Sequence, residues 1–166
     1  MSELPSVAFA GIGLMGHRMC HRLLAAGYPL TVWNRSPEKC ASLIEAGARR
    51  VDSPAELCAA ADLVLLCLAD TAVVREVVFG AGGIVEGARP GQLLIDHSSL
   101  EPAATRNMAA ELESRCGMYW VDAPVSGGTA GASRLASTPE RSARATTSAM
   151  TSALQPTIIW LQALVT

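Results

Sequence analysis

The sequence predicts an α/β fold with a doubly wound, mostly parallel sheet. Short apolar runs alternate with segments of helical spacing from residue 6 to residue 121, which is typical of successive strand–helix–strand units. The run from 62 to 68 is almost wholly apolar, as expected for a parallel strand that is buried on both faces. A glycine-rich turn follows the first apolar run and leads into the first helical segment.

The expected elements follow one another with short connections. Two helix starts combine an N-capping serine with a proline in the first helical position, at Ser36 and Ser53. Gly27 and Gly47 stand where a glycine commonly ends a helix. Strands are expected at 6–10, 30–33, 49–51, 62–68, 92–95 and 118–121, and helices at 16–26, 36–46, from 53 onward, 71–79 and 101–115.

The composition changes after Ala132. From 132 to 153 nearly every residue is Ala, Ser, Thr or Arg, and neither the period of a strand nor that of a helix persists. We therefore predict one folded domain over residues 1–132. Residues 133–166 are expected to form an irregular or loosely packed tail rather than a second domain.

Composition and charge exclude several classes of protein. The 166 residues carry a formal net charge of −2 without a basic stripe, so we expect no nucleic-acid partner. No apolar stretch approaches the ~20 residues that a membrane span needs, and the N-terminus lacks a basic leader, so we expect no membrane association. Five cysteines, an odd number without a CxxC pair, indicate reduced thiols and a cytoplasmic protein.

The glycine-rich turn is the strongest functional signal. Gly11-Ile12-Gly13-Leu14-Met15-Gly16 matches the GxGxxG pattern between a strand and a helix, where it indicates dinucleotide binding by a Rossmann fold. Gly11 would permit the tight turn, Gly13 would let the backbone approach a pyrophosphate, and Gly16 would let the helix lie close to the sheet. The first N–H groups of the helix, at Leu14 and Met15, would bind the phosphates. The Met15 side chain either contacts the cofactor or packs inside the domain.

The end of the second expected strand predicts NADP rather than NAD. NAD-specific domains carry an acidic residue about 20 residues after the glycines, whereas this chain has Asn34-Arg35-Ser36. Arg35 can pair with a 2′-phosphate through its planar guanidinium, Ser36 can donate to it, and Lys39 lies one turn further. One charge-assisted hydrogen bond contributes about 1.5–3 kcal/mol, which is about a tenfold preference or more.

Two other residue groups suggest chemistry that we do not expect. His17 and His21 are four residues apart, but no third ligand is apparent nearby, so we expect no metal site. Asp96, His97 and Ser98 contain the letters of a hydrolase triad, but adjacent residues cannot align as nucleophile, base and orienting acid.

Several motifs together resemble the β-hydroxyacid dehydrogenase family. That family includes 3-hydroxyisobutyrate dehydrogenases, tartronate semialdehyde reductases and glyoxylate or succinic semialdehyde reductases. The resemblance covers residues 6 to 132, and its most specific part is Asp122-Ala123-Pro124-Val125-Ser126-Gly127-Gly128. The other matching segments are 11–16, 32–36, 61–68, 96–99 with Pro102, and 131–132.

The resemblance implies roles for individual residues. Ser126, Gly127 and Gly128 would hold the carboxylate of a small substrate through a hydroxyl and backbone N–H groups. Ser99 would contact the nicotinamide or the substrate. The adenosine side of the cofactor cleft would be lined by Leu68 and Ala69.

The chain departs from the family after Ala132. The family continues with a Gly-Thr-Leu strand and an all-α domain that supplies a catalytic lysine and an asparagine, whereas here the tail stands in that place. Lys39 is the only lysine in the chain, so no residue would supply the lysine's acid–base catalysis, often 10²–10⁴-fold. We therefore expect no catalytic residue in this chain. A reading-frame shift near codon 132 would explain the break.

Three functional hypotheses remain open at this point. The first is the NADP-binding domain of an oxidoreductase that transfers hydride between NADPH and a small semialdehyde or 3-hydroxy acid. The second is a non-catalytic dinucleotide-binding fragment from a truncated or frameshifted gene. The third is the N-terminal domain of an imine-reductase-like protein, against which the 122–128 motif argues because it suits a carboxylate substrate. Loss of the α-domain would expose apolar surface, so self-association is also expected.

Overall fold

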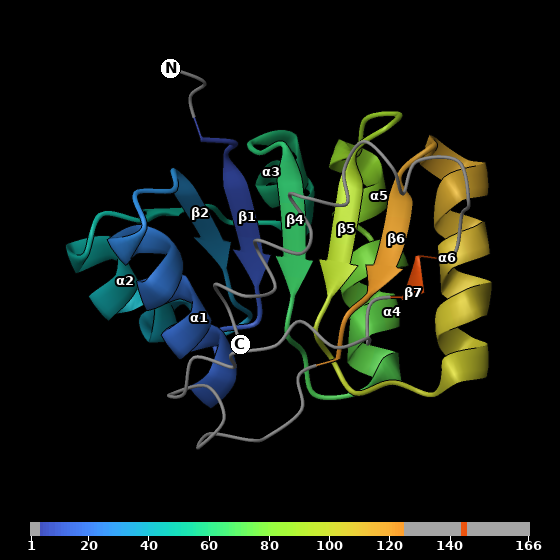
Figure 1. The fold of residues 1–166 in the computed structure, drawn as a ribbon, viewed down its shortest axis with the longest axis horizontal. Coiled ribbons are helices and arrows are strands. Elements are labelled where there is room, and N and C mark those ends of the chain that lie inside the picture. The colour runs from blue at the N-terminus through green and yellow to red at the C-terminus, as the bar shows by residue number, and fades with distance from the viewer. Residues whose placement is uncertain (1–3, 125–143, 146–166) are drawn as a thin grey trace.

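The described residues form a seven-stranded sheet with helices on both faces (Figure 1). The computed structural model describes residues 4–124 and 144–145. The strand order is β3-β2-β1-β4-β5-β6-β7; neighbours from β3 to β6 are parallel, and β7 is antiparallel to β6. The strands are β1 (Val7–Ala10), β2 (Leu30–Trp33), β3 (Arg49–Arg50), β4 (Leu63–Leu66), β5 (Leu93–Asp96), β6 (Tyr119–Asp122) and β7 (Arg144–Ala145).

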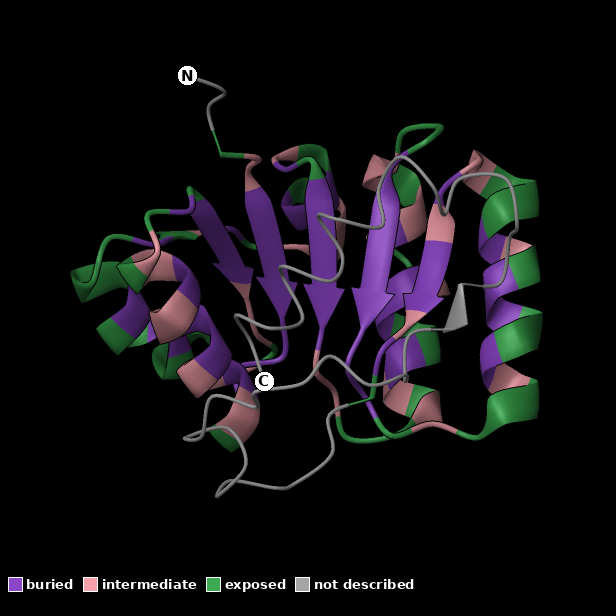
Figure 2. Cartoon of the chain, in the orientation of Figure 1, coloured by how far each residue is buried: buried purple, intermediate pink, exposed green. Residues whose placement is uncertain are grey.

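Alternating side chains of the central strands build one core on each face of the sheet. Phe9, Leu65 and Ile95 lie in the core that includes α1 and α2, whereas Val64 and Leu94 lie in the core that includes α3 to α6. The central strands are therefore buried on both sides, as Figure 2 shows. The helices are α1 (Leu14–Ala25), the 3₁₀ helix η1 (Pro37–Cys40), α2 (Ala41–Glu45), α3 (Pro54–Ala59), α4 (Thr71–Phe79), α5 (Ile84–Gly87) and α6 (Pro102–Cys116).

The predicted fold class is confirmed, one expected helix is divided, and two further elements were not expected. The helix expected at 36–46 is divided, because Lys39 donates to the carbonyl of Ser36 in a 3₁₀ turn before α2 begins. Helix α5 was not expected; Gly87 approaches α3 so closely there that an added Cβ would overlap the carbonyl oxygen of Ala55. Strand β7 was also not expected, and it pairs with Val121 and Asp122 of β6.

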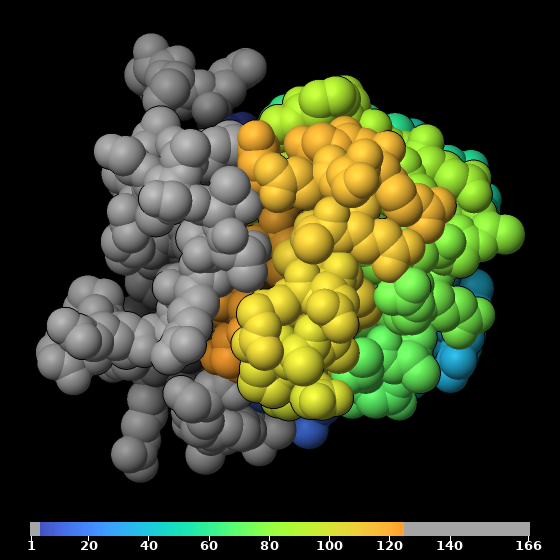
Figure 3. Space-filling model, turned by 90° about the vertical axis from the view of Figure 1, so that its right-hand side faces the viewer, coloured from blue at the N-terminus to red at the C-terminus, as the bar shows by residue number. Residues whose placement is uncertain are grey.

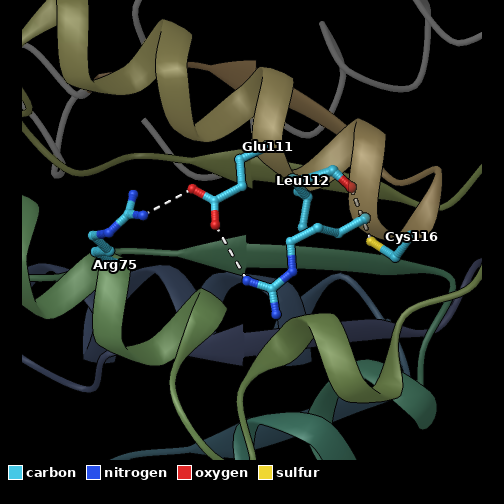
Figure 4. Close-up of polar contacts among 5 residues, drawn as sticks. Arg75, Glu111, Leu112 and Cys116 are labelled. Atoms are coloured by element: carbon cyan, nitrogen blue, oxygen red, sulfur yellow. Dashed lines mark hydrogen bonds and ion pairs between the residues drawn. The ribbon is translucent and has the colours of Figure 1, made fainter.

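Helices α4 and α6 lie beside each other on the face shown in Figure 3 and are joined by an exposed ionic cluster (Figure 4). The Glu111 carboxylate accepts from Arg75 at 2.8 Å and from Arg115 at 3.2 Å. Both guanidinium groups lie over the Phe79 ring, at 5.3 and 5.4 Å from its centroid. The hydrogen bond from Arg75, above all, lowers the pKa of Glu111. This cluster connects the two helices far from the glycine-rich turn.

Candidate functional site: a dinucleotide-binding crevice

The glycine-rich turn and the loops after β2, β4 and β5 meet at the carboxyl edge of the sheet (Figure 1). Strands β2 and β3 lie on one side of β1, and β4 to β6 lie on the other. The direction of the strand order therefore reverses between β1 and β4. In doubly wound sheets this reversal point is where the carboxyl ends of the strands open to hold a ligand.

Packing explains two of the three glycines in the turn from 11 to 16, which we call the glycine turn. Gly11 has φ +100°, a conformation that strains other residues, and an added Cβ would overlap the carbonyl oxygen of Cys67. A Cβ on Gly16 would overlap the carbonyl oxygen of Gly11, so this glycine lets α1 approach the turn. Gly13 is exposed and has open space where its Cβ would lie. No close contact with another described residue requires a glycine at this position. The missing side chain leaves the backbone open to a ligand.

The start of α1 is suited to bind an anion. Gly13 is the N-cap residue and offers no side chain to the first N–H groups of the helix. The first turn contains no acidic residue that would compete with a bound phosphate. Leu14, the first residue of the helix, is 66% exposed, and Met15 is half-buried.

The loop after β2 is attached to the glycine turn by hydrogen bonds. The N–H of Gly11 donates to the carbonyl of Trp33 at 3.2 Å, and the N–H of Ile12 donates to Oδ1 of Asn34 at 2.9 Å. Nδ2 of Asn34 donates in turn to the carbonyl of Ser36 at 3.0 Å. The two turns predicted to bind the two phosphate-bearing parts of a dinucleotide are thus joined through one side chain.

The cationic residues expected to select the cofactor lie at the surface. Arg35 and Lys39 are exposed and Ser36 is half-buried. Asp52, in the loop after β3, is paired with Arg50, so its charge is partly neutralised. Within the described part of the chain Arg35 has no ion-pair partner and can reach a ligand.

The loops after β4 and β5 support the other side of the crevice. The N–H of Leu68 donates to Oγ of Ser98 at 2.9 Å, and the N–H of Ser98 donates to Oδ1 of Asp96 at 2.9 Å. Leu68 is half-buried beside Gly11, whereas Ala69 and Ser99 are exposed at the edge of the sheet. The structure therefore brings all of the described residues predicted to bind the cofactor to one edge.

Two buried titratable residues lie behind these loops, and the sequence had not indicated their importance. Burial raises the pKa of Asp96 to about 6 against the opposing effect of the Ser98 hydrogen bonds, and burial lowers the pKa of His97 to about 4. Nδ1 of His97 lies 2.8 Å from the carbonyl oxygen of Ala123, so the neutral ring donates there. Nδ1 of His97 is thus directed to Ala123 rather than to Asp96 or Ser98, and the Asp96 carboxylate accepts from the Ser98 backbone.

Three further predictions concern the histidine pair, membrane association and the substrate site. The ring centroids of His17 and His21 lie 4.6 Å apart, and Nε2 of His17 lies 2.7 Å from Oγ of Ser42. Among the described residues there is no group of three potential metal ligands. No helix in the described ranges is long and apolar enough to cross a membrane. The residues expected to bind the substrate carboxylate, Ser126, Gly127 and Gly128, lie outside the described residues.

The strand order, the glycine turn and the open start of α1 define a Rossmann-type nucleotide-binding domain. A family model described as the NAD binding domain of 6-phosphogluconate dehydrogenase matches residues 6–153. The chain therefore belongs to this family of NAD-binding domains.

Relatives of known name agree with this membership. The chain is 38% identical over 132 residues to mitochondrial 3-hydroxyisobutyrate dehydrogenase of Mus musculus, covering 80% of this chain and 39% of that protein. It is 38% identical over 121 residues to cytokine-like nuclear factor N-PAC of Xenopus tropicalis, covering 73% of this chain and 22% of that protein. The resemblance to 3-hydroxyisobutyrate dehydrogenases is thus confirmed, and the chain spans less than half the length of these relatives.

Two solved structures share the fold. Psf3 in complex with NADP⁺ and 2-OPP superposes with a TM-score of 0.71 at 33% identity, covering 76% of this chain and 44% of that one. The imine reductase BcSIRED from Bacillus cereus BAG3X2 superposes with a TM-score of 0.68 at 35% identity, covering 76% of this chain and 42% of that one.

Proposed function

We propose that this domain binds NADP in preference to NAD, with the pyrophosphate on the glycine turn and the 2′-phosphate beside Arg35 and Ser36. The observation that carries the proposal is the exposed Arg35, which stands without an ion-pair partner in the described part of the chain and beside a turn bonded to the glycine turn. No acidic residue follows β2 directly to repel a 2′-phosphate. The similarity to Psf3, whose structure holds NADP⁺, supports the same cofactor.

In a complete protein of this kind, the bound cofactor would exchange a hydride with a small semialdehyde or 3-hydroxy acid. The 38% identity to a 3-hydroxyisobutyrate dehydrogenase supports this substrate class. Ser126, Gly127 and Gly128 would hold the substrate carboxylate, and Ser99, which is exposed at the end of β5, would contact the nicotinamide or the substrate.

A second candidate is cofactor binding without catalysis by these 166 residues. Lys39, the sole lysine, lies on η1 next to the proposed 2′-phosphate site rather than beside Ser99. The resemblance implies a lysine as the proton donor to the carbonyl oxygen during reduction, and these 166 residues place no lysine beside Ser99. An imine-reductase-like activity is the remaining alternative, supported by the similarity to BcSIRED. NADPH oxidation in the presence of a cyclic imine, and not in the presence of a semialdehyde, would identify it.

Calorimetric titration with NADPH and with NADH tests the proposed cofactor. We expect clear NADPH binding and weaker NADH binding. Replacing Arg35 by alanine should weaken NADPH binding about tenfold or more through loss of a charge-assisted contact and leave NADH binding unchanged.

Arg106→Ala is the matched control, because Arg106 is exposed on α6 and its replacement removes the same charge far from the crevice. Equal binding of both cofactors by the wild-type protein would contradict the proposed preference. Binding of neither would reject the site.

A further inference from the structure

The side chain of Asn34 occupies the junction between the two turns of the crevice. Its Oδ1 accepts from the N–H of Ile12, twenty-two residues earlier in the chain, and its Nδ2 donates to the carbonyl of Ser36. We propose that Asn34 is a positioning residue that sets the distance between the glycine turn and the turn from 34 to 36, which we call the adenosine turn. This inference rests on the proposed cofactor site and assigns to Asn34 a role other than direct contact with the cofactor.

The two hydrogen bonds match the two ends of an amide. Ile12 presents a donor and Ser36 presents an acceptor, so the side chain between them must accept at one end and donate at the other. A carboxylate can accept from Ile12, but it cannot donate and would set a negative oxygen against the carbonyl of Ser36. Alanine makes neither bond. The asparagine is therefore determined by hydrogen bonding within the domain, apart from any ligand.

The same bonds divide the glycine turn into two functional parts. The N–H groups of Gly11 and Ile12 are directed to Trp33 and Asn34, which anchors the first part of the turn to the end of β2. The second part runs from Gly13, the N-cap residue, into α1, and no side chain of Gly13 caps the first N–H groups of the helix. Loss of the Asn34 bonds would free Ile12 and displace the second part with it, whereas the bond from Gly11 to Trp33 would remain.

On the other side, the bond to Ser36 holds the adenosine turn. Arg35 lies between Asn34 and Ser36, so its backbone is held at both ends while its side chain remains exposed. Asn34 would thus define where the guanidinium and the Ser36 hydroxyl stand relative to the start of α1. A dinucleotide with a 2′-phosphate needs both groups at once, because its two phosphate-bearing parts are covalently joined. Preorganisation of this kind raises affinity by reducing the ordering that binding would otherwise require.

Comparison of two alanine variants separates positioning from contact. Arg35→Ala removes a cofactor contact, so NADPH binding should weaken and NADH binding should not. Asn34→Ala removes the link between the turns, so NADH affinity should fall by about tenfold if a contribution of about 1.4 kcal/mol is lost. NADPH affinity should fall by at least as much, because the site for its 2′-phosphate is displaced as well. If Asn34→Ala leaves NADH affinity unchanged, the glycine turn does not depend on Asn34 and the proposal is overturned.

Asn34→Asp distinguishes the two bonds. The carboxylate keeps an acceptor for Ile12 but loses the donor to Ser36, and it adds a negative charge beside the adenosine turn. We expect the ratio of NADPH affinity to NADH affinity to fall by more than tenfold, while the Ile12 amide remains protected.

Amide hydrogen exchange measured by NMR tests the coupling without any cofactor. The Ile12 amide should exchange faster in Asn34→Ala than in wild type, whereas the Gly11 amide, bonded to the Trp33 backbone, should keep its protection. Failure of wild type to bind either cofactor would reject the proposed function, and the exchange rates would still decide the coupling. Unchanged exchange of Ile12 in Asn34→Ala would overturn the inference even if NADPH binds, and thermal unfolding confirms that each variant is folded.

Discussion

The two sides of the crevice are built from different groups. At the ends of β1 and β2 lie the uncapped start of α1 and an exposed arginine, and one amide side chain joins the two turns. At the ends of β4 and β5, the polar groups are buried and bond to one another, from Leu68 to Ser98 to Asp96. The first side is suited to bind an anion. The second side shapes and supports the crevice, so substitutions on the two sides should differ in whether they affect binding or stability.

The largest effect is expected at Gly11. Alanine there would occupy a positive φ and overlap the Cys67 carbonyl, so we expect the free energy of unfolding to fall by about 3 kcal/mol or more. Urea unfolding measures this change. Gly13→Ala is the matched control, because Gly13 has an extended backbone and open space, and its stability should change by less than about 0.5 kcal/mol.

The same pair of glycine variants sharpens the comparison for binding. Gly13→Ala places a methyl group where a pyrophosphate would approach, so NADPH affinity should fall although the fold is unchanged. A stable Gly11→Ala protein would show that the turn can open away from β4, and would contradict the packing described for this glycine.

An intermediate effect is expected from Asp96, and it depends on pH. The raised pKa of Asp96 means that the folded state binds this proton more tightly than the unfolded state does. The contribution of Asp96 to the free energy of unfolding therefore falls as pH rises from about 4 to about 6. His97 has a lowered pKa and does the opposite over about pH 4 to 6.5. In the wild-type protein the two dependences oppose each other.

Asp96→Asn removes one of these two opposing contributions. The free energy of unfolding of the variant, relative to that of wild type, should rise by on the order of 2–3 kcal/mol between pH 4 and pH 7. Urea unfolding at the two pH values checks this expectation. A difference between variant and wild type that does not change with pH would mean that Asp96 titrates alike in the folded and unfolded states.

The smallest effect is expected outside both regions, at Glu111. Its bonds to Arg75 and Arg115 are exposed to solvent, so Glu111→Gln should change Tm less than either substitution above. The pKa of Glu111 is lowered in the folded protein, so the cluster stabilises the fold only while this carboxyl is ionised. The stabilisation is fully present above the pKa of the unfolded carboxyl, and acidification should remove it. Cofactor affinity should be unchanged, and any change in it would show that the α4–α6 face communicates with the crevice.

Much of the fold could be predicted from local sequence patterns. The strand expected at 30–33 and the helix expected at 71–79 have the observed bounds, because the alternation of apolar residues and the glycines that end helices act over a few residues. Helix α5 and strand β7 were missed, because the first depends on close packing against α3 and the second on pairing with β6. Among the candidate site residues, the glycine turn and the 34–36 segment were predicted from residue types and spacing, and the structure joins the two through Asn34.

The sequence by itself determined the alternation of strands β1 to β6 with helices, the glycine turn and the exchange of an acidic residue for Asn34-Arg35-Ser36. Each depends on the conformational or chemical properties of residues that are neighbours in the chain. Only the tertiary structure decided that Asn34 bonds to Ile12, that Asp96 and His97 are buried with shifted pKa values, and that β7 joins the sheet. These features arise where segments far apart in the chain come together, and their energies depend on burial and hydrogen-bond partners that no local pattern specifies.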